Sequence, residues 1–361
     1  MCLSLGGAEY RTLVARRGST RGAALTELDC IFIPVRGPMP SSMLFRDLNL
    51  LSSHLRPLAL LRAALVLCAT WAGPCAVDAQ TKAPPPTLQK IRQTGVIVLA
   101  HRESSIPFSY FDADKRPVGY ALDLCLRVVE GIRRDYKLPN LKVIYLPVSP
   151  ADRIPSIVEG RADLECGNTT NNAVRRKLVA FTMTHYFAGG RLLVHSKSGV
   201  RRLSDLRGKT VVSTRGSTHL AFLNDQVDHG IISVRLLTAK DSDEAFKMLE
   251  ENRADAFLMD DIVLYSLRAN AKEPTAYAVV GDYTTVEPLA IMLRKNDPEF
   301  KRYVDLVVTR FMMDGEIQSL YSRWFQGPIP PKGVTLEVPM GALMRDQVRF
   351  PSDKVGDDIG G

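Results

Sequence analysis

Most of the chain alternates short apolar runs with segments of helical periodicity. Residues 96–100 form a continuous apolar run typical of a buried strand, and residues 120–134 place Leu122, Leu126 and Val129 on one face of a helix. The same criteria predict strands at 141–146 and 163–166, with a helix between Ser149 and Gly160.

The same alternation recurs in a second block of the chain. Strands are predicted at 210–213, 234–237 and 255–258, and helices from 218, at 243–251 and at 261–271, with two more helices at 298–314 and 316–324. Alternation of this kind is typical of parallel sheets covered by helices. The pattern therefore predicts an α/β protein with two lobes.

A different pattern precedes this part of the chain. Arg56 and Arg62 flank the start of an apolar run of signal-peptide length, which is followed by Val77-Asp78-Ala79. Arg62 interrupts the run, which makes it too short for a membrane span. We expect a signal peptide that is cleaved after Ala79 and directs export; the alternative is a buried core helix.

Export leaves two of the six cysteines in the mature chain, Cys125 and Cys166. They are either a disulfide, as an oxidising compartment favours, or two buried free thiols that act as small hydrophobic residues. The sequence leaves both alternatives open.

Composition and motifs exclude several classes of function. The net charge is +8, from 47 Lys and Arg against 39 Asp and Glu, and the basic residues do not gather into a stripe. Nucleic acid is therefore an unfavourable partner. The sequence has no P-loop, G-x-S-x-G, H-E-x-x-H, C-x-x-C or G-x-G-x-x-G motif. We expect no cofactor and no metal site.

Ligands of open parallel sheets bind at the carboxyl ends of the strands. Arg102 directly follows the first predicted strand, and Arg153 opens the helix after the second. The planar guanidinium of such a residue suits a carboxylate, although a solvated or Glu-paired surface arginine is the alternative. Asn168, Thr170 and Arg175 follow the third strand, and Arg175 at a helix start opposes the helix dipole unless an anion compensates it.

The second block offers three more candidates. Ser217 and Thr218 lie between a strand and a helix, where they either cap the helix or bind an anion. Asp260 follows the apolar strand at 255–258, and it either caps the next helix or holds a ligand ammonium group. Asp261 is the better capping candidate of the two.

These residues lie in motifs that resemble the family-3 solute-binding proteins of bacterial ABC importers, and within that family the branch that binds glutamate and aspartate. The resemblance covers about residues 87–332 and is carried by HRESSIPFSYFD, VGYALDL, DRIPSIVEGRADLECGNTTNNAVRRKLVAF, LSDLRGKTVV, ENRADAFLMDDIVL, IMLRKNDPEFK and WFQGPIPPKG. It implies a type II periplasmic-binding-protein-like fold, in which two Rossmann-like lobes are joined by two hinge crossovers. The implied organisation is an upstream segment with signal peptide (1–79), a linker (80–86), lobe 1 (87–187 and 285–335), lobe 2 (188–284) and a flexible tail (336–361).

The resemblance also implies roles for the candidate residues. Arg175 would hold the ligand α-carboxylate with Thr170 and the helix start at Ser217 and Thr218. Asp260 would hold the ammonium group, with Asn168 beside it, and Arg102 and Arg153 would bind the side-chain carboxylate. Three guanidinium groups and one carboxylate would match the two carboxylates and one ammonium group of glutamate or aspartate. The implied partner is an inner-membrane permease, and a monomer is expected.

Some positions depart from the family pattern. Asn168 lies where this branch usually has serine, Pro150 replaces an expected ligand-facing serine, and Ser242 lies where the branch can have histidine. The preference between glutamate and aspartate is therefore open. The alternative function is a periplasmic dehydratase of a cyclic carboxylate of the prephenate or arogenate type. It would need a general acid, for which the cleft offers Glu103, Glu165 and Asp260.

Overall fold

The computed structural model of the chain describes residues 86–356. The predicted signal peptide, its cleavage site after Ala79 and all but the last residue of the predicted linker lie outside the described residues. The described residues belong to one compact unit. No helix among them is both long enough and apolar enough to cross a membrane.

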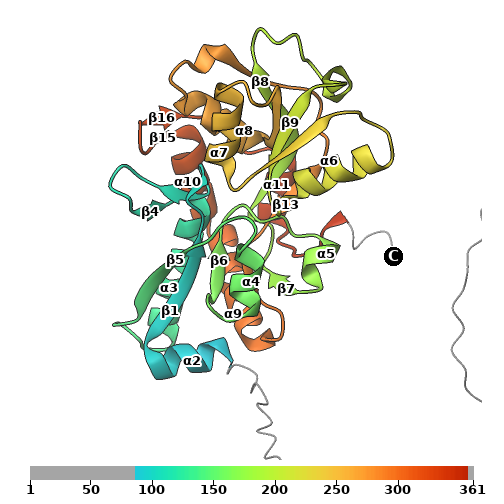
Figure 1. Cartoon of the computed structure of the whole chain (residues 1–361). Coiled ribbons are helices and arrows are strands. Elements are labelled where there is room, and N and C mark those ends of the chain that lie inside the picture. The colour runs from blue at the N-terminus through green and yellow to red at the C-terminus, as the bar shows by residue number, and fades with distance from the viewer. Residues whose placement is uncertain (1–85, 357–361) are drawn as a thin grey trace, which may run out of the picture. The chain divides into compact units, whose positions relative to one another are not determined.

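The first sheet has five strands in the order β5-β1-β6-β14-β7. Figure 1 labels β1, β5, β6 and β7 of this sheet in the lower half of the view. β1 (Val96–His101) pairs in parallel with β5 (Lys142–Pro147) and β6 (Leu164–Cys166), whereas β14 (Met292–Arg294) is antiparallel to β6 and β7 (Val179–Phe181). The helices of this part are α2 (Thr87–Thr94), α3 (Tyr120–Asp135), α4 (Arg153–Val158), α5 (Ala173–Arg176), α9 (Pro298–Met313) and α10 (Glu316–Tyr321), which continues as η3 (Ser322–Gln326).

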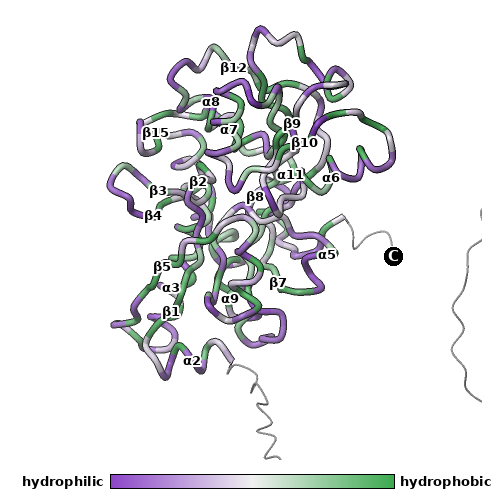
Figure 2. The backbone as a smooth tube through the Cα atoms, viewed as in Figure 1, coloured by the Kyte–Doolittle hydropathy of each residue, from purple (hydrophilic) through white to green (hydrophobic). Residues whose placement is uncertain are grey.

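The second sheet has six strands, five of them in the order β10-β9-β11-β8-β12, and β13 pairs with β8. Its strands are β8 (Tyr186–His195), β9 (Thr210–Thr214), β10 (Arg235–Ala239), β11 (Ala256–Asp260), β12 (Tyr277–Val280) and β13 (Val286–Leu289). The accompanying helices are α6 (Thr218–Asp228), α7 (Ser242–Glu250) and α8 (Asp261–Asn270), with short turns η1 (Leu203–Leu206) and η2 (Pro274–Ala276). Figure 2 shows hydrophobic stretches along β1, β5 and β9, as the sequence pattern predicts.

The chain passes between the two sheets twice. It leaves the first sheet after β7 and enters the second as β8, and it returns through β13 to β14. β13 is antiparallel to the first part of β8, with Leu289 opposite Tyr186. The predicted α/β architecture with two crossovers is therefore confirmed. The predicted lobe boundaries after residues 187 and 284 fall within β8 and just before β13.

A small sheet that the sequence pattern did not predict follows Arg102. It consists of β2 (Ser104–Ser105), β3 (Ser109–Phe111) and β4 (Pro117–Val118), strands too short to show periodicity. The Ser109 hydroxyl oxygen accepts a hydrogen bond from the Arg102 backbone N–H at 2.9 Å, which anchors the loop that carries this arginine. A second small pairing joins β15 (Pro328–Ile329) and β16 (Val334–Thr335).

Cys125 and Cys166 form a disulfide, which excludes the free-thiol alternative. Cys125 lies on α3 and Cys166 is the last residue of β6, and both are fully buried. The bond therefore links the helix layer to the strand end from which the loop with Asn168 and Thr170 starts.

The expectation of a poorly ordered tail is wrong for the part that the structure describes. Within the predicted tail (336–361), the helix α11 spans Ala342–Arg349, and its residues Met344 and Val348 are buried in the core. These two apolar residues are four positions apart, so they share one helix face. Beyond the helix, Asp353 forms an ion pair with Lys301 at 2.9 Å.

Candidate ligand-binding site

The eight predicted site residues come from loops and helix starts at strand ends in both sheets. The eight residues are Arg102, Arg153, Asn168, Thr170, Arg175, Ser217, Thr218 and Asp260. All of them are buried except Thr218, which is half-buried. Burial of three arginines is unusual, because a buried guanidinium requires a partner for its charge. The arginines therefore do not serve as solvated surface residues.

Two of the arginines meet at one backbone carbonyl of the second block. Arg153 and Arg175 each donate from Nη2 to the carbonyl oxygen of Gly216, both at 3.2 Å. Arg175 also donates from Nη1 to the carbonyl oxygen of Thr170 at 2.9 Å. A Cβ atom on Gly216 would lie 2.9 Å from the carbonyl oxygen of Pro150, and its φ is +76°. Glycine thus permits the close approach of the two loops.

Among the buried donors of these three arginines, two in Arg102 and one in Arg153 (Nε) have no hydrogen-bond partner in the part of the chain that is described. The side chain of Arg102 is 3% exposed, and within residues 86–356 no group accepts a hydrogen bond from its Nε or Nη1. Buried donors without a partner are rare in folded proteins. These two N–H groups therefore remain available for an anionic ligand.

Helix capping fixes two of the loops. Asn172 accepts a hydrogen bond from the backbone N–H of Arg175 at 2.9 Å and so begins α5. Ser217 begins α6, because its hydroxyl oxygen accepts from Leu220 N–H at 3.0 Å while the hydroxyl donates to the Thr214 carbonyl at 2.8 Å. The Ser217 side chain therefore caps α6, which is one of the two roles that the sequence analysis considered for it. Asp260 has no side-chain capping hydrogen bond to α8.

Both carboxylate oxygens of Asp260 already have partners. Asn168 donates from Nδ2 to Oδ2 at 2.8 Å, and Nε2 of His219 lies 2.9 Å from Oδ1. All three side chains are buried. His219 is a site residue that the sequence analysis missed, although it directly follows the candidate Thr218.

Two further carboxylates make the charge count from sequence incomplete. Glu165 on β6 is fully buried and lies beside Arg102. A Cβ atom placed on Gly167 would lie 2.5 Å from Oε1 of Glu165 and 2.9 Å from Cγ of Arg102. Glu287 on β13 is also buried and accepts a hydrogen bond from the Thr218 hydroxyl at 2.9 Å. Three carboxylates, not one, accompany the three guanidinium groups.

The electrostatics favour an added anion. Burial, followed by the charge of Arg153, lowers the pKa of Arg102 and of Arg175 to about 9. Burial also lowers the pKa of Arg153 and raises the pKa of Glu165, in the latter case against the attraction of Arg153 and Arg102. The cations therefore repel one another and are poorly solvated, so a carboxylate that entered among them would be bound strongly.

Residues 97–327 match the family model described as bacterial extracellular solute-binding proteins, family 3. The chain belongs to this family. It is 41% identical over 274 residues to the L-glutamate/L-aspartate-binding protein of Pseudomonas aeruginosa, covering 76% of this chain and 91% of that protein. It is 38% identical over 291 residues to the glutamate/aspartate import solute-binding protein of Escherichia coli, covering 81% and 96%.

Solved structures agree with this family fold, the type II periplasmic binding fold. The cysteine-binding protein of Campylobacter jejuni has a TM-score of 0.60 at 21% identity, covering 66% of this chain and 92% of that one. An ancestral amino acid-binding protein, described as a precursor of cyclohexadienyl dehydratase, has a TM-score of 0.58 at 25% identity and covers 66% and 100%. The predicted fold class is confirmed.

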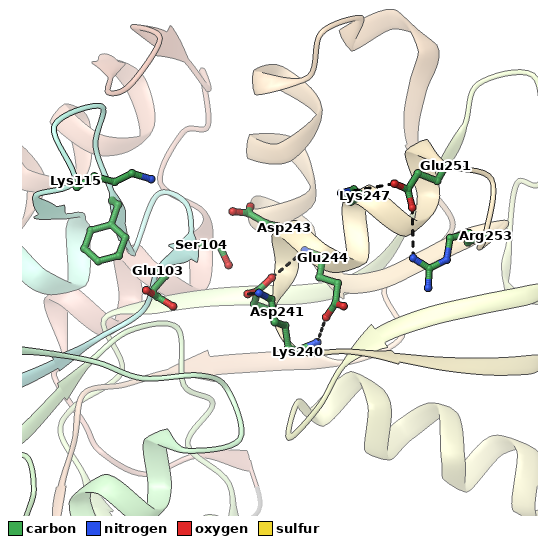
Figure 3. Close-up of a pocket in the computed structure, with 11 residues that line it drawn as sticks. Glu103, Ser104, Lys115, Lys240, Asp241, Asp243, Glu244, Lys247, Glu251 and Arg253 are labelled. Atoms are coloured by element: carbon green, nitrogen blue, oxygen red, sulfur yellow. Dashed lines mark hydrogen bonds and ion pairs between the residues drawn. The ribbon is translucent and has the colours of Figure 1, made fainter.

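A separate cavity of about 880 Å³ lies beside the β2–β3 hairpin and α7 (Figure 3). Its lining is polar, and its charges largely pair among themselves: Glu251 contacts Lys247 at 3.7 Å and Arg253 at 3.4 Å. The backbone N–H of Lys240 donates to Glu244 at 2.6 Å. None of the three buried arginines lines this cavity.

No metal site accompanies these residues in the part of the chain that is described. Between residues 86 and 356 no group of three or more His, Cys, Asp or Glu side chains could hold a metal ion.

Proposed function

We propose that this family member is the periplasmic substrate-binding component of an ABC amino-acid importer and that it binds glutamate or aspartate. One observation carries the proposal: three arginines are buried close enough to interact, because Arg153 repels both Arg102 and Arg175 and the charge of Asp260 acts on all three. The names of the relatives from Pseudomonas aeruginosa and Escherichia coli support the same ligand class.

Different arginines would bind the two carboxylates of the ligand. Arg175, with the Thr170 backbone and the start of α6, would bind the α-carboxylate. Its hydrogen bonds to the carbonyl oxygens of Thr170 and Gly216 hold the guanidinium between these two loops. Arg102 and Arg153 would bind the side-chain carboxylate with charge-assisted hydrogen bonds.

The ammonium group of the ligand would be held by Asp260, with Asn168 beside it. Asn168 fixes one carboxylate oxygen of Asp260 at 2.8 Å, so the orientation of that carboxylate is set before the ligand binds.

Ligand binding would favour the closed arrangement of the two sheets. Arg153 and Arg175 follow strands of the first sheet, whereas Gly216 follows β9 of the second. A ligand that contacts both sides shifts the population toward closure by its difference in affinity for the two states. Micromolar binding corresponds to about 8 kcal/mol, which charge-assisted contacts in a desolvated cleft can supply. The closed form would deliver the ligand to an inner-membrane permease, and we expect a monomer without nucleic-acid partners.

Isothermal titration calorimetry of the protein without its leader tests the proposal. We expect glutamate or aspartate to bind with release of heat and glutamine to bind at least tenfold more weakly, because glutamine lacks the second carboxylate. Prephenate is expected neither to bind nor to be converted. Binding of glutamine as tightly as glutamate, or turnover of prephenate, would overturn the proposal. The comparisons do not favour the dehydratase alternative.

A further inference from the structure

The hydrogen bond between His219 and Asp260 places an ionisable group at the ammonium end of the proposed site. His219 is 1% exposed and Asp260 is 2% exposed, and His219 Nε2 lies 2.9 Å from Asp260 Oδ1. Nδ1 of His219 is buried and has no hydrogen-bond partner among residues 86–356. The imidazole is thus held against the same carboxylate that the ligand ammonium group would use.

We propose that His219 is a specificity-determining residue that competes with the ligand ammonium group for Asp260, so that its protonation state sets how strongly the site prefers an amino acid to a dicarboxylate without an amine. The proposal rests on the proposed function and deepens it. When His219 is neutral, the charge of Asp260 is available to an ammonium group. When His219 is charged, Asp260 is already neutralised and the imidazolium repels the ammonium group.

The groups that face His219 determine where it titrates. Asp260 on β11 and Glu287 on β13 favour the charged imidazole, and Arg175 on α5 opposes it. On the β8 side it faces Gly190, whose Cβ, if present, would lie 3.0 Å from Nδ1, so that strand adds no charge there.

Burial alone would lower the pKa of His219, but the hydrogen bond and charge of Asp260 outweigh it and raise the pKa above its usual 6.5. His219 therefore becomes charged at a higher pH than an unperturbed histidine does.

The charge of the whole site supports a role in selectivity. Arg102, Arg153 and Arg175 are balanced by Glu165, Asp260 and Glu287, all six of them buried. Protonation of His219 then adds one uncompensated positive charge. An amine-free dicarboxylate carries one more negative charge than glutamate, so it gains more from this added charge. Selectivity for the amine must therefore decrease as the pH falls.

The test compares L-glutamate with glutarate, which has the same two carboxylates and no amine. Dissociation constants of both are measured by calorimetry at pH 5.5 and pH 8 for the wild type, His219→Gln and Asp260→Asn. Glutamine at position 219 can still donate a hydrogen bond to Asp260 but does not titrate. His229→Gln is the matched control, because His229 lies at the other end of α6 on the exposed surface. Circular dichroism and thermal unfolding confirm that each variant is folded.

In the wild type and in His229→Gln, we expect the preference for glutamate over glutarate to fall by about tenfold from pH 8 to pH 5.5. In His219→Gln the preference should stay near its value at pH 8, and in Asp260→Asn it should be small at both values. A preference in the wild type that does not change with pH overturns the inference, and so does an equal change in His219→Gln. If the wild type binds neither glutamate nor aspartate at pH 8, the proposed function itself fails. If it binds them but its preference does not depend on His219, only the inference about His219 fails.

Discussion

Replacing Arg102 by methionine is expected to weaken ligand binding strongly without destabilising the ligand-free protein. Methionine keeps an unbranched side chain but removes the charge. The guanidinium is buried, and within the described residues its Nε and Nη1 have no hydrogen-bond partner. Burial, followed by the charge of Arg153, lowers the pKa of Arg102 to about 9. The protein without ligand thus holds this charge at an energetic cost.

The size of that cost follows from the change in pKa. The fall from the ordinary value of arginine to about 9 corresponds to roughly 5 kcal/mol against the charged form. Because the folded pKa lies below the unfolded one, the cost is fully present below about pH 9 and disappears as the pH rises toward the unfolded pKa. At pH 7 the variant no longer has the cost of a buried positive charge, but Glu165 loses the electrostatic attraction of Arg102. We expect a net change between zero and about 2 kcal/mol of added stability, or a Tm rise of up to about 8 °C.

Binding should change in the opposite direction. Each hydrogen bond from a charged group contributes about 1.5–3 kcal/mol, and a guanidinium fork can make two to one carboxylate. Loss of both weakens affinity by roughly 10²- to 10⁴-fold. Calorimetric titration with glutamate measures the affinity, and thermal unfolding at pH 7 without ligand measures the stability. Arg302→Met on the exposed side of α9 is the control for removal of a surface charge.

Two results would refute this reasoning. A ligand-free Arg102→Met protein that loses more than about 1 kcal/mol would show that the guanidinium stabilises the fold. A variant that binds glutamate within threefold of the wild type would show that Arg102 does not contact the ligand.

Three further predictions concern stability. Cys125→Ala together with Cys166→Ala should cost about 2–5 kcal/mol in denaturant unfolding, because the disulfide closes a loop with a sequence separation of 41; an unchanged midpoint would contradict a stabilising role. Burial lowers the pKa of His185 to about 3, so the unfolded state binds a proton more readily below pH 6.5 and stability falls as the pH drops from 6.5 toward 3. His185→Phe should flatten the unfolding free energy over that range, and a slope equal to that of the wild type would count against it. Met344→Ala should lower stability by about 2–4 kcal/mol, because Met344 packs in the core from α11; a loss below 0.5 kcal/mol would indicate that α11 detaches.

The sequence alone located β1, β5, β6, β9, β10 and β11, most of the helices that accompany them, and the loops of the proposed site. The core strands are continuous apolar runs and the helices are amphipathic, so local periodicity is sufficient to find them. Strand ends then pointed to arginines such as Arg102 and Arg175, which the structure buries. The sequence analysis did not predict α2, α11 or the strands β2 to β4, β7, β8 and β12 to β14. Strands of two or three residues show no period, and a polar helix with two core contacts such as α11 resembles a charged tail.

Only the tertiary structure decided which charges share the site. Glu165, His219 and Glu287 come from β6, α6 and β13, which are far apart in sequence, and no spacing rule connects them to Arg175 or Asp260. Their importance depends on burial, because a charge that water would screen on the surface acts on its neighbours across a desolvated cleft. The disulfide was settled in the same way, since only the packing of α3 on β6 brings the two cysteines together.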